Sequence, residues 1–147
     1  MERRNIVLVE DNPDDVDLTL RSLKKNNIMN EVIVLQDGQE ALDYLFETGK
    51  YAGRENRATT AVVLLDLKLP KVDGIEVLRR LRQDERTKLL PIVILTSSKE
   101  EKDLVNGYKF GANSYVRKPV DFEHFSKAVQ ELGLYWLVLN EPPPQGV

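Results

Sequence analysis

The sequence predicts an α/β fold built around a parallel β-sheet. Short β-branched apolar segments alternate five times with longer segments whose apolar residues recur at helical spacing. The short segments contain almost no polar residues, which is typical of strands covered by helices on both faces. A strand–helix unit repeated in this way favours right-handed crossovers within one (βα)5 sheet. The 147 residues match the length of a single domain.

Five apolar segments are predicted as strands, and most are rich in valine, isoleucine or leucine. They are IVLV (Ile6–Val9), VIVL (Val32–Leu35), AVVLL (Ala61–Leu65), IVIL (Ile92–Leu95) and SYV (Ser114–Val116). The last has the weakest signal because it is the shortest.

Five amphipathic segments predict helices that follow these strands. Their apolar residues are Val16, Leu20 and Leu23; Ala41, Leu42 and Leu45; Ile75, Leu78 and Leu81; Leu104 and Tyr108; and Phe125, Val129, Leu132 and Trp136. Pro13 is well placed near the start of the first helix. The second and third helices each follow an Asp-Gly pair, Asp37–Gly38 and Asp73–Gly74, and Gly111 is placed to end the fourth.

Residues 1–140 are expected to form one domain. The longest loop is predicted between Thr48 and Thr60, where a flexible insertion is expected. The Pro-rich segment 141–147 is expected to be a disordered tail.

The end of the fifth predicted helix is apolar on every side, over residues 134–139. A helix of this kind near a chain end favours burial against a partner. A symmetric dimer through this helix is therefore expected, with Tyr135, Trp136 and Leu139 as candidate contacts. The alternative is that the segment packs back onto its own domain.

Composition argues against several kinds of site and partner. The chain has no cysteine and one histidine, His124, so disulfides and thiolate metal sites are excluded and a histidine zinc site lacks ligands. The net charge of −3 and the lack of a basic stripe predict no binding to nucleic acid or anionic membranes. No segment has the length of a membrane span and no export signal is found, so a cytoplasmic location is expected.

Polar residues follow the carboxyl ends of four predicted strands. Glu10 and Asp11 follow the first, Asp66 the third, Thr96 the fourth and Lys118 the fifth. Ligands of open parallel sheets bind beyond these ends, so a strand order of 2-1-3-4-5 would gather the groups around one pocket. Three carboxylates beside one lysine are poorly balanced in charge, which predicts a divalent cation. Ligands that are all oxygen favour Mg²⁺ over Zn²⁺.

In such a pocket Asp66 is a candidate nucleophile, and an acyl phosphate on Asp66 is a sensible product. Lys118 and Thr96 are then placed to hold phosphoryl oxygens. Each residue taken alone has a simpler explanation: Glu10 or Asp11 as the N-cap of the first helix, Asp66 in a turn, and Lys118 as a surface lysine. The convergence of four strand ends favours the functional interpretation.

These motifs resemble the response regulator receiver domains of two-component signalling. The matching residues are the ED of VEDN (Glu10, Asp11), the D of LLDLKLPKVDG (Asp66), the T of ILTSS (Thr96), the KP of YVRKP (Lys118, Pro119) and Tyr115. The resemblance covers roughly residues 4–135. It implies a flavodoxin-like three-layer sandwich with a five-stranded parallel sheet of order 2-1-3-4-5.

The resemblance also implies a role for each acidic residue. Asp66 would accept a phosphoryl group from a phosphohistidine on a sensor histidine kinase. Mg²⁺ would be held by Glu10, Asp11, Asp66 and the backbone carbonyl of Lys68.

Four further residues receive roles from the resemblance alone. Lys118 would pair with the phosphoryl group, and the peptide bond between Lys118 and Pro119 would be cis. Thr96 would move toward a phosphoryl oxygen and Tyr115 would rotate inward, so that a protein-interaction face changes.

The long loop and the tryptophan-containing C-terminal segment resemble stand-alone receivers that partner bacterial phytochrome kinases. A homodimer and a light-sensing histidine kinase are therefore expected, and the chain is expected to be a signalling receiver, not an enzyme. Alternatives are a phosphate sink, a relay intermediate and a degenerate receiver that is not phosphorylated. A haloacid-dehalogenase-like phosphatase is disfavoured because its second acid would stand where this sequence has Lys68. A nucleotide-binding protein is disfavoured because glycine-rich phosphate motifs are lacking.

Overall fold

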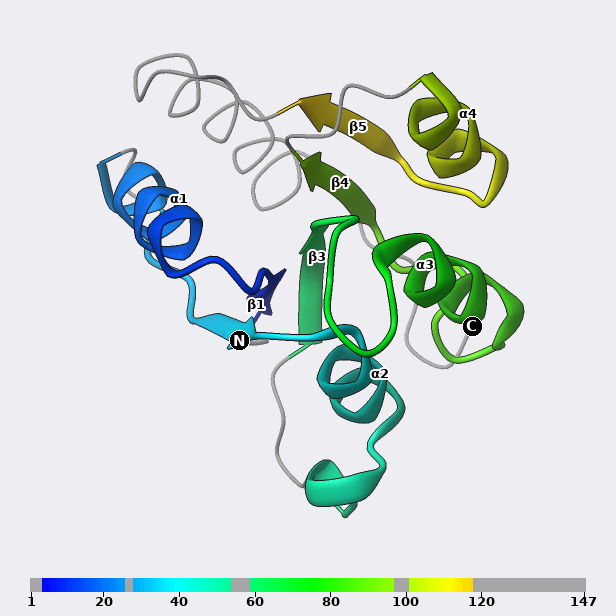
Figure 1. Ribbon diagram of the computed structural model, residues 1–147. Helices are drawn as coiled ribbons and strands as arrows, with labels where there is room; N and C mark the ends of the chain where they lie inside the picture. Colours follow the sequence, from blue (N-terminus) through cyan, green and yellow to red (C-terminus); the bar gives the residue numbers. More distant parts are fainter. Residues whose placement is uncertain (1–3, 26–27, 54–58, 97–100, 118–147) are drawn as a thin grey trace.

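Five parallel strands form one sheet with helices on both faces (Figure 1). The computed structural model describes residues 4–25, 28–53, 59–96 and 101–117. The strands are β1 (Arg4–Val9), β2 (Val32–Leu35), β3 (Thr59–Leu65), β4 (Ile92–Thr96) and β5 (Ser114–Arg117). The helices are α1 (Pro13–Lys25), α2 (Gly38–Phe46), α3 (Gly74–Gln83) and α4 (Glu101–Lys109), with a 3-10 turn, η1 (Gly49–Tyr51). The strand order is β2-β1-β3-β4-β5, so the predicted fold class is confirmed.

The two faces of the sheet carry separate hydrophobic cores. Val7 and Val9 of β1 point into the core that α2 and α3 cover. Ile6 and Leu8 alternate with them and point into the core that α1 covers. Figure 1 shows α1 on one side of the sheet and α2 and α3 on the other. This arrangement explains why the strand segments lack polar residues, since both faces are buried.

The buried face of α1 differs from the predicted one. Leu20 is 36% exposed, whereas Thr19 and Ser22 are buried beside Leu23. The hydroxyl of Ser22 donates to the carbonyl oxygen of Leu18 at 2.9 Å, which satisfies a polar group inside the helix contact. The prediction that Leu20 lies on the buried face of α1 is therefore wrong.

The loop after α2 contains a short regular element. Its first part forms the turn η1, in which Tyr51 packs its ring edge-on against Tyr44 with 5.1 Å between ring centroids. Strand β3 then begins at Thr59, two residues before the predicted start at Ala61. Residues 54–58 of the predicted insertion lie outside the described residues.

Several predicted features lie beyond the part of the chain that the structure describes. They are the fifth helix, the dimer candidates Tyr135, Trp136 and Leu139, the tail 141–147, and Lys118 with Pro119. Within the described ranges, no helix combines the length and the apolar character that crossing a bilayer requires.

Candidate functional site

Three carboxylates meet at the carboxyl ends of β1 and β3. Glu10, Asp11 and Asp66 each offer an oxygen atom, and these atoms all lie within 4.8 Å of one another. The sheet explains the meeting, because Val9 and Leu65 are partners in parallel register and the next residue of each strand is acidic. The structure thus brings together the acids that the sequence places after its first and third strands.

Two of these carboxylates are buried. Glu10 is 3% and Asp66 is 7% exposed, whereas Asp11 is exposed to solvent. Main-chain N–H groups hold both buried side chains: Leu67 donates to Oδ1 of Asp66 at 2.7 Å, and Asn12 donates to Oε2 of Glu10 at 3.3 Å. Buried carboxylates this close together repel each other, and a bound cation offsets that repulsion. An all-oxygen donor set of this charge fits a hard divalent cation.

The residue that caps α1 is Asn12, which follows the acidic pair Glu10 and Asp11. Helix α1 begins behind Asn12, whose Oδ1 accepts hydrogen bonds from the N–H groups of Asp14 at 2.9 Å and Asp15 at 3.2 Å. The capping explanation for Glu10 and Asp11 is therefore wrong. Capping of α1 therefore does not account for the position of these two acids, which strengthens the case for a binding role.

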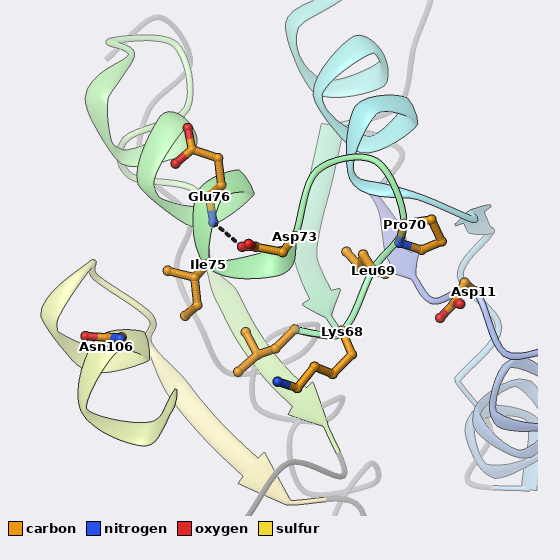
Figure 2. Close-up of a pocket in the computed structure, with 9 residues that line it drawn as sticks. Asp11, Lys68, Leu69, Pro70, Asp73, Ile75, Glu76 and Asn106 are labelled. Atoms are coloured by element: carbon orange, nitrogen blue, oxygen red, sulfur yellow. Dashed lines mark hydrogen bonds between the residues drawn. The ribbon is translucent and has the colours of Figure 1, made fainter. Parts of the chain in front are cut away.

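A cavity of about 690 Å³ opens beside the acidic cluster (Figure 2). It is lined by Asp11, Leu67, Lys68, Leu69, Pro70, Asp73, Ile75, Glu76 and Asn106. In Figure 2, Lys68 lies between Asp11 on one side and Asn106 of α4 on the other. Most of the lining comes from the segment that links β3 to α3, so this loop shapes both the cluster and the cavity. Asn106 could not be recognised from the sequence, because a single polar residue in a helix that lines a cavity looks the same as one that faces solvent.

The two acids at the start of α3 that line the cavity, Asp73 and Glu76, already have hydrogen-bond partners. Hydrogen bonds from Arg79 and then from Arg80 lower the pKa of Glu76 to about 2. The guanidinium Nε atoms of both arginines lie 2.8 Å from its carboxylate oxygens. Asp73 accepts a hydrogen bond from the N–H of Glu76 at 3.0 Å and caps α3, as the dashed line in Figure 2 marks. Both acids therefore stabilise α3, which distinguishes them from the candidate metal ligands Glu10, Asp11 and Asp66.

The structure places the other predicted site residues only in part. Thr96 ends β4 and Tyr115 lies in β5 in register with Ile94, but their side chains are outside the described part of the chain. Lys118 and Pro119 are outside it altogether.

Comparison with known proteins identifies the family. The family model for the response regulator receiver domain matches residues 6–130. A probable methanogenesis regulatory protein, FilR2 of Methanothrix harundinacea, is 41% identical over 94% of this chain and 86% of its own length. The response regulator Rcp1 of Synechocystis is 39% identical over 90% of this chain and 88% of its own length.

Solved structures give the same assignment. The Mn²⁺-bound form of Rcp1 matches with a TM-score of 0.85 at 37% identity, covering 95% of this chain and 99% of that one. The phosphorylated cyanobacterial phytochrome response regulator RcpA matches with a TM-score of 0.88 at 34% identity, covering 97% and 99%. The bacteriophytochrome response regulator AtBRR is 55% identical, with a TM-score of 0.76 and coverage of 96% and 100%. On fold, motif order and sequence together, the chain belongs to the response regulator receiver domain family.

Proposed function

We propose that this receiver accepts a phosphoryl group on Asp66 from a phosphohistidine of a sensor histidine kinase, with Mg²⁺ bound beside it. The observation that carries the proposal is the meeting of three carboxylates within 4.8 Å, two of them buried, at the carboxyl edge of the sheet. Glu10, Asp11, Asp66 and the main-chain carbonyl of Lys68 would hold the ion. Bound there, Mg²⁺ would offset the negative charge of the carboxylates and of the incoming phosphoryl oxygens.

The transfer is a substitution at phosphorus. An oxygen of Asp66 forms a bond to phosphorus while the P–N bond to the imidazole breaks, and the imidazole nitrogen keeps the electron pair. The N–H of Leu67 holds Oδ1 of Asp66 at 2.7 Å, which fixes the orientation of the carboxylate before the reaction. The product is an acyl phosphate on Asp66.

The signalling step uses residues of β4 and β5 in this proposal. Thr96 and Arg117 are partners in parallel register, and Lys118 follows Arg117 in the sequence. Adjacent strands therefore support Thr96 and Lys118 as the groups that hold the phosphoryl oxygens, with a cis bond before Pro119. Tyr115 on β5 would respond by changing the face used for protein contact.

A phytochrome-type histidine kinase is the proposed donor. RcpA and AtBRR are both named as phytochrome response regulators, and AtBRR is 55% identical over 96% of this chain. FilR2, at 41% identity, is named for a methanogenesis role, so sequence similarity extends beyond light sensing. The proposal rests on AtBRR because its identity of 55% is higher than that of FilR2 and because the alignment covers 100% of the AtBRR chain.

Binding of Mg²⁺ is expected to raise the melting temperature of the wild-type protein, and Asp11→Ala is expected to remove this increase. A ligand that binds only the folded state stabilises it by about 2.7 kcal/mol at a concentration 100 times its dissociation constant. Differential scanning calorimetry with and without Mg²⁺ measures the shift. Chelation is also expected to stop labelling of the wild type by a small phosphodonor.

The control for Asp11 is Asp84→Ala, which removes a partly exposed acid that pairs with Arg86 at the other end of α3. This variant is expected to keep the full Mg²⁺ increment whatever its basal stability. If Mg²⁺ left the melting temperature of the wild type unchanged, the proposed metal site would be contradicted.

A homodimer through the last helix is also proposed, because residues 134–139 are apolar on every side. Trp136→Glu is expected to convert the dimer to a monomer in analytical ultracentrifugation, since a buried charge at an interface is costly. Tyr108→Glu is the matched control, because Tyr108 is an aromatic residue of α4 that is 52% exposed. A wild-type monomer at high concentration would contradict the proposal, and loss of the dimer only with Tyr108→Glu would move the interface to α4.

A further inference from the structure

The loop between β3 and α3 is held from two sides. Its residues 66–73 include Asp66 and Lys68. The N–H of Gly74, the first residue of α3, donates to the carbonyl oxygen of Leu67 at 2.9 Å. The N–H of Gly38, the first residue of α2, donates to the carbonyl oxygen of Pro70 at 3.2 Å. Figure 1 shows this loop reaching across to the start of α2, although α2 precedes it by a whole strand.

Both contacts are too close to admit a side chain. A Cβ atom on Gly38 would lie 1.7 Å from the carbonyl oxygen of Val72, and one on Gly74 would lie 2.2 Å from the carbonyl oxygen of Asp66. Both obstacles are main-chain atoms, which cannot rotate out of the way. Any larger residue at either position must therefore displace the loop.

Asp37 adds a second connection from α2. Its Oδ1 accepts a hydrogen bond from the N–H of Glu40 at 2.7 Å and so caps α2. Its Oδ2 lies 3.5 Å from the ammonium of Lys71 in the loop. Lys71 has a φ of +67°, a left-handed conformation that costs a non-glycine residue about 1–2 kcal/mol. Contacts around the loop must stabilise this conformation of Lys71, and the ion pair with Asp37 is one of them.

We infer that the Asp37–Gly38 pair is a positioning element of the metal site, which sets the orientation of the Lys68 carbonyl. This inference rests on the proposed function, in which that carbonyl is a metal ligand. A main-chain ligand can be oriented only through its neighbours in the loop. The two anchors, at Leu67 and at Pro70, lie one residue before and two residues after Lys68.

A displacement at Gly38 would pass along the loop through hydrogen bonds. The carbonyl oxygen of Pro70 accepts from the N–H of Gly38 and also from the N–H of Val72, the latter at 2.8 Å. Val72 is the residue that a side chain at position 38 would push. Moving Val72 therefore moves Pro70 and with it the Lys68 peptide.

Gly38→Ala is expected to weaken Mn²⁺ binding about tenfold, as changes in groups that orient a metal ligand do. Electron paramagnetic resonance of free Mn²⁺ measures the dissociation constant without relying on a protein signal. Oxygen-17 relaxation of the bound ion is expected to show one additional water, which replaces the lost carbonyl. A purely structural role would lower stability and leave this water count unchanged.

Gly53→Ala is the matched control. Gly53 has a positive φ, +72°, but apart from its chain neighbours nothing lies within 4 Å of a Cβ placed there. The variant therefore carries a backbone strain without pressing on the loop, and it is expected to bind Mn²⁺ as the wild type does.

A second variant covers the case in which Gly38→Ala fails to fold. Lys71→Gly removes the ion pair to Asp37 and relieves the left-handed strain, so it is expected to fold and to bind Mn²⁺ about threefold more weakly. If the wild type binds Mn²⁺ and the folded variants Gly38→Ala and Lys71→Gly bind it with the same affinity and the same number of waters, the positioning role is wrong. The proposed function would then still stand. Absence of Mn²⁺ binding by the wild type would overturn both.

Discussion

Asp66→Asn is expected to abolish phosphorylation by a small phosphodonor in the presence of Mg²⁺. The amide has nearly the shape of the carboxylate but is a far weaker nucleophile, so the rate is expected to fall by at least about a thousandfold. Mass spectrometry of the intact protein, which detects the addition of one phosphoryl group, measures the outcome. The same result is expected with a phosphorylated histidine kinase as the donor.

Unfolding is not expected to explain the loss of labelling. Asp66→Asn removes one of three charges whose oxygen atoms lie within 4.8 Å, so the variant is expected to be at least as stable as the wild type without Mg²⁺. Asp84→Asn changes a partly exposed acid away from the cluster and is expected to label normally. Full labelling of Asp66→Asn would show that another residue is the acceptor.

The strands were predictable because their sequences are buried on both faces. Residues such as Val7 and Leu8 point into different cores, so the whole segment is apolar and stands out. The strand order came from the family resemblance, since periodicity carries no information about which strands are neighbours. The exposure of Leu20 was not predictable, because Thr19 and Ser22 are buried in α1 at positions where apolar periodicity gives no signal.

The acidic cluster was predictable because its members follow directly on buried strands. The support for the adjoining loop was not predictable in the same way. The Asp37–Gly38 pair indicates a helix start in any protein, and only the folded chain brings it against the carbonyl oxygens of Pro70 and Val72. Contacts between residues far apart in sequence leave no local signal.

The structural role of Arg82 was also not predictable from the sequence. In the sequence it is one of several arginines of α3 and matches a solvated helix face. In the structure its guanidinium donates to the carbonyl oxygens of Leu90 at 2.7 Å, Gly111 at 2.8 Å and Lys88 at 3.1 Å, and to Oδ1 of Asn113 at 2.9 Å. Oδ1 of Asn113 also accepts from the N–H of Ile92 at 2.8 Å, at the start of β4. One side chain thus joins α3, the segment before β4 and the turn before β5.

Arg82→Met is expected to lower the free energy of unfolding by about 3 kcal/mol. Methionine fills similar space but leaves partly buried carbonyl oxygens without their charged donor, and hydrogen bonds to charged groups contribute about 1.5–3 kcal/mol each. Burial lowers the pKa of the Arg82 guanidinium, yet its usual value is so high that the group stays charged at neutral pH. Urea unfolding measures the change, and the melting temperature is expected to fall by about 10 °C.

Two variants separate the geometry of Arg82 from its charge. Arg82→Lys keeps the charge but not the planar fork, so it is expected to recover only a minor part of the stability. Arg80→Ala removes a neighbouring arginine of α3 that is 45% exposed and pairs with Glu76, and it is expected to cost less than about 1 kcal/mol. If Arg82→Met unfolded within about 0.5 kcal/mol of the wild type, the hydrogen bonds of Arg82 would be replaced by water at no cost. If Arg82→Lys matched the wild type, the charge alone would hold these three segments together.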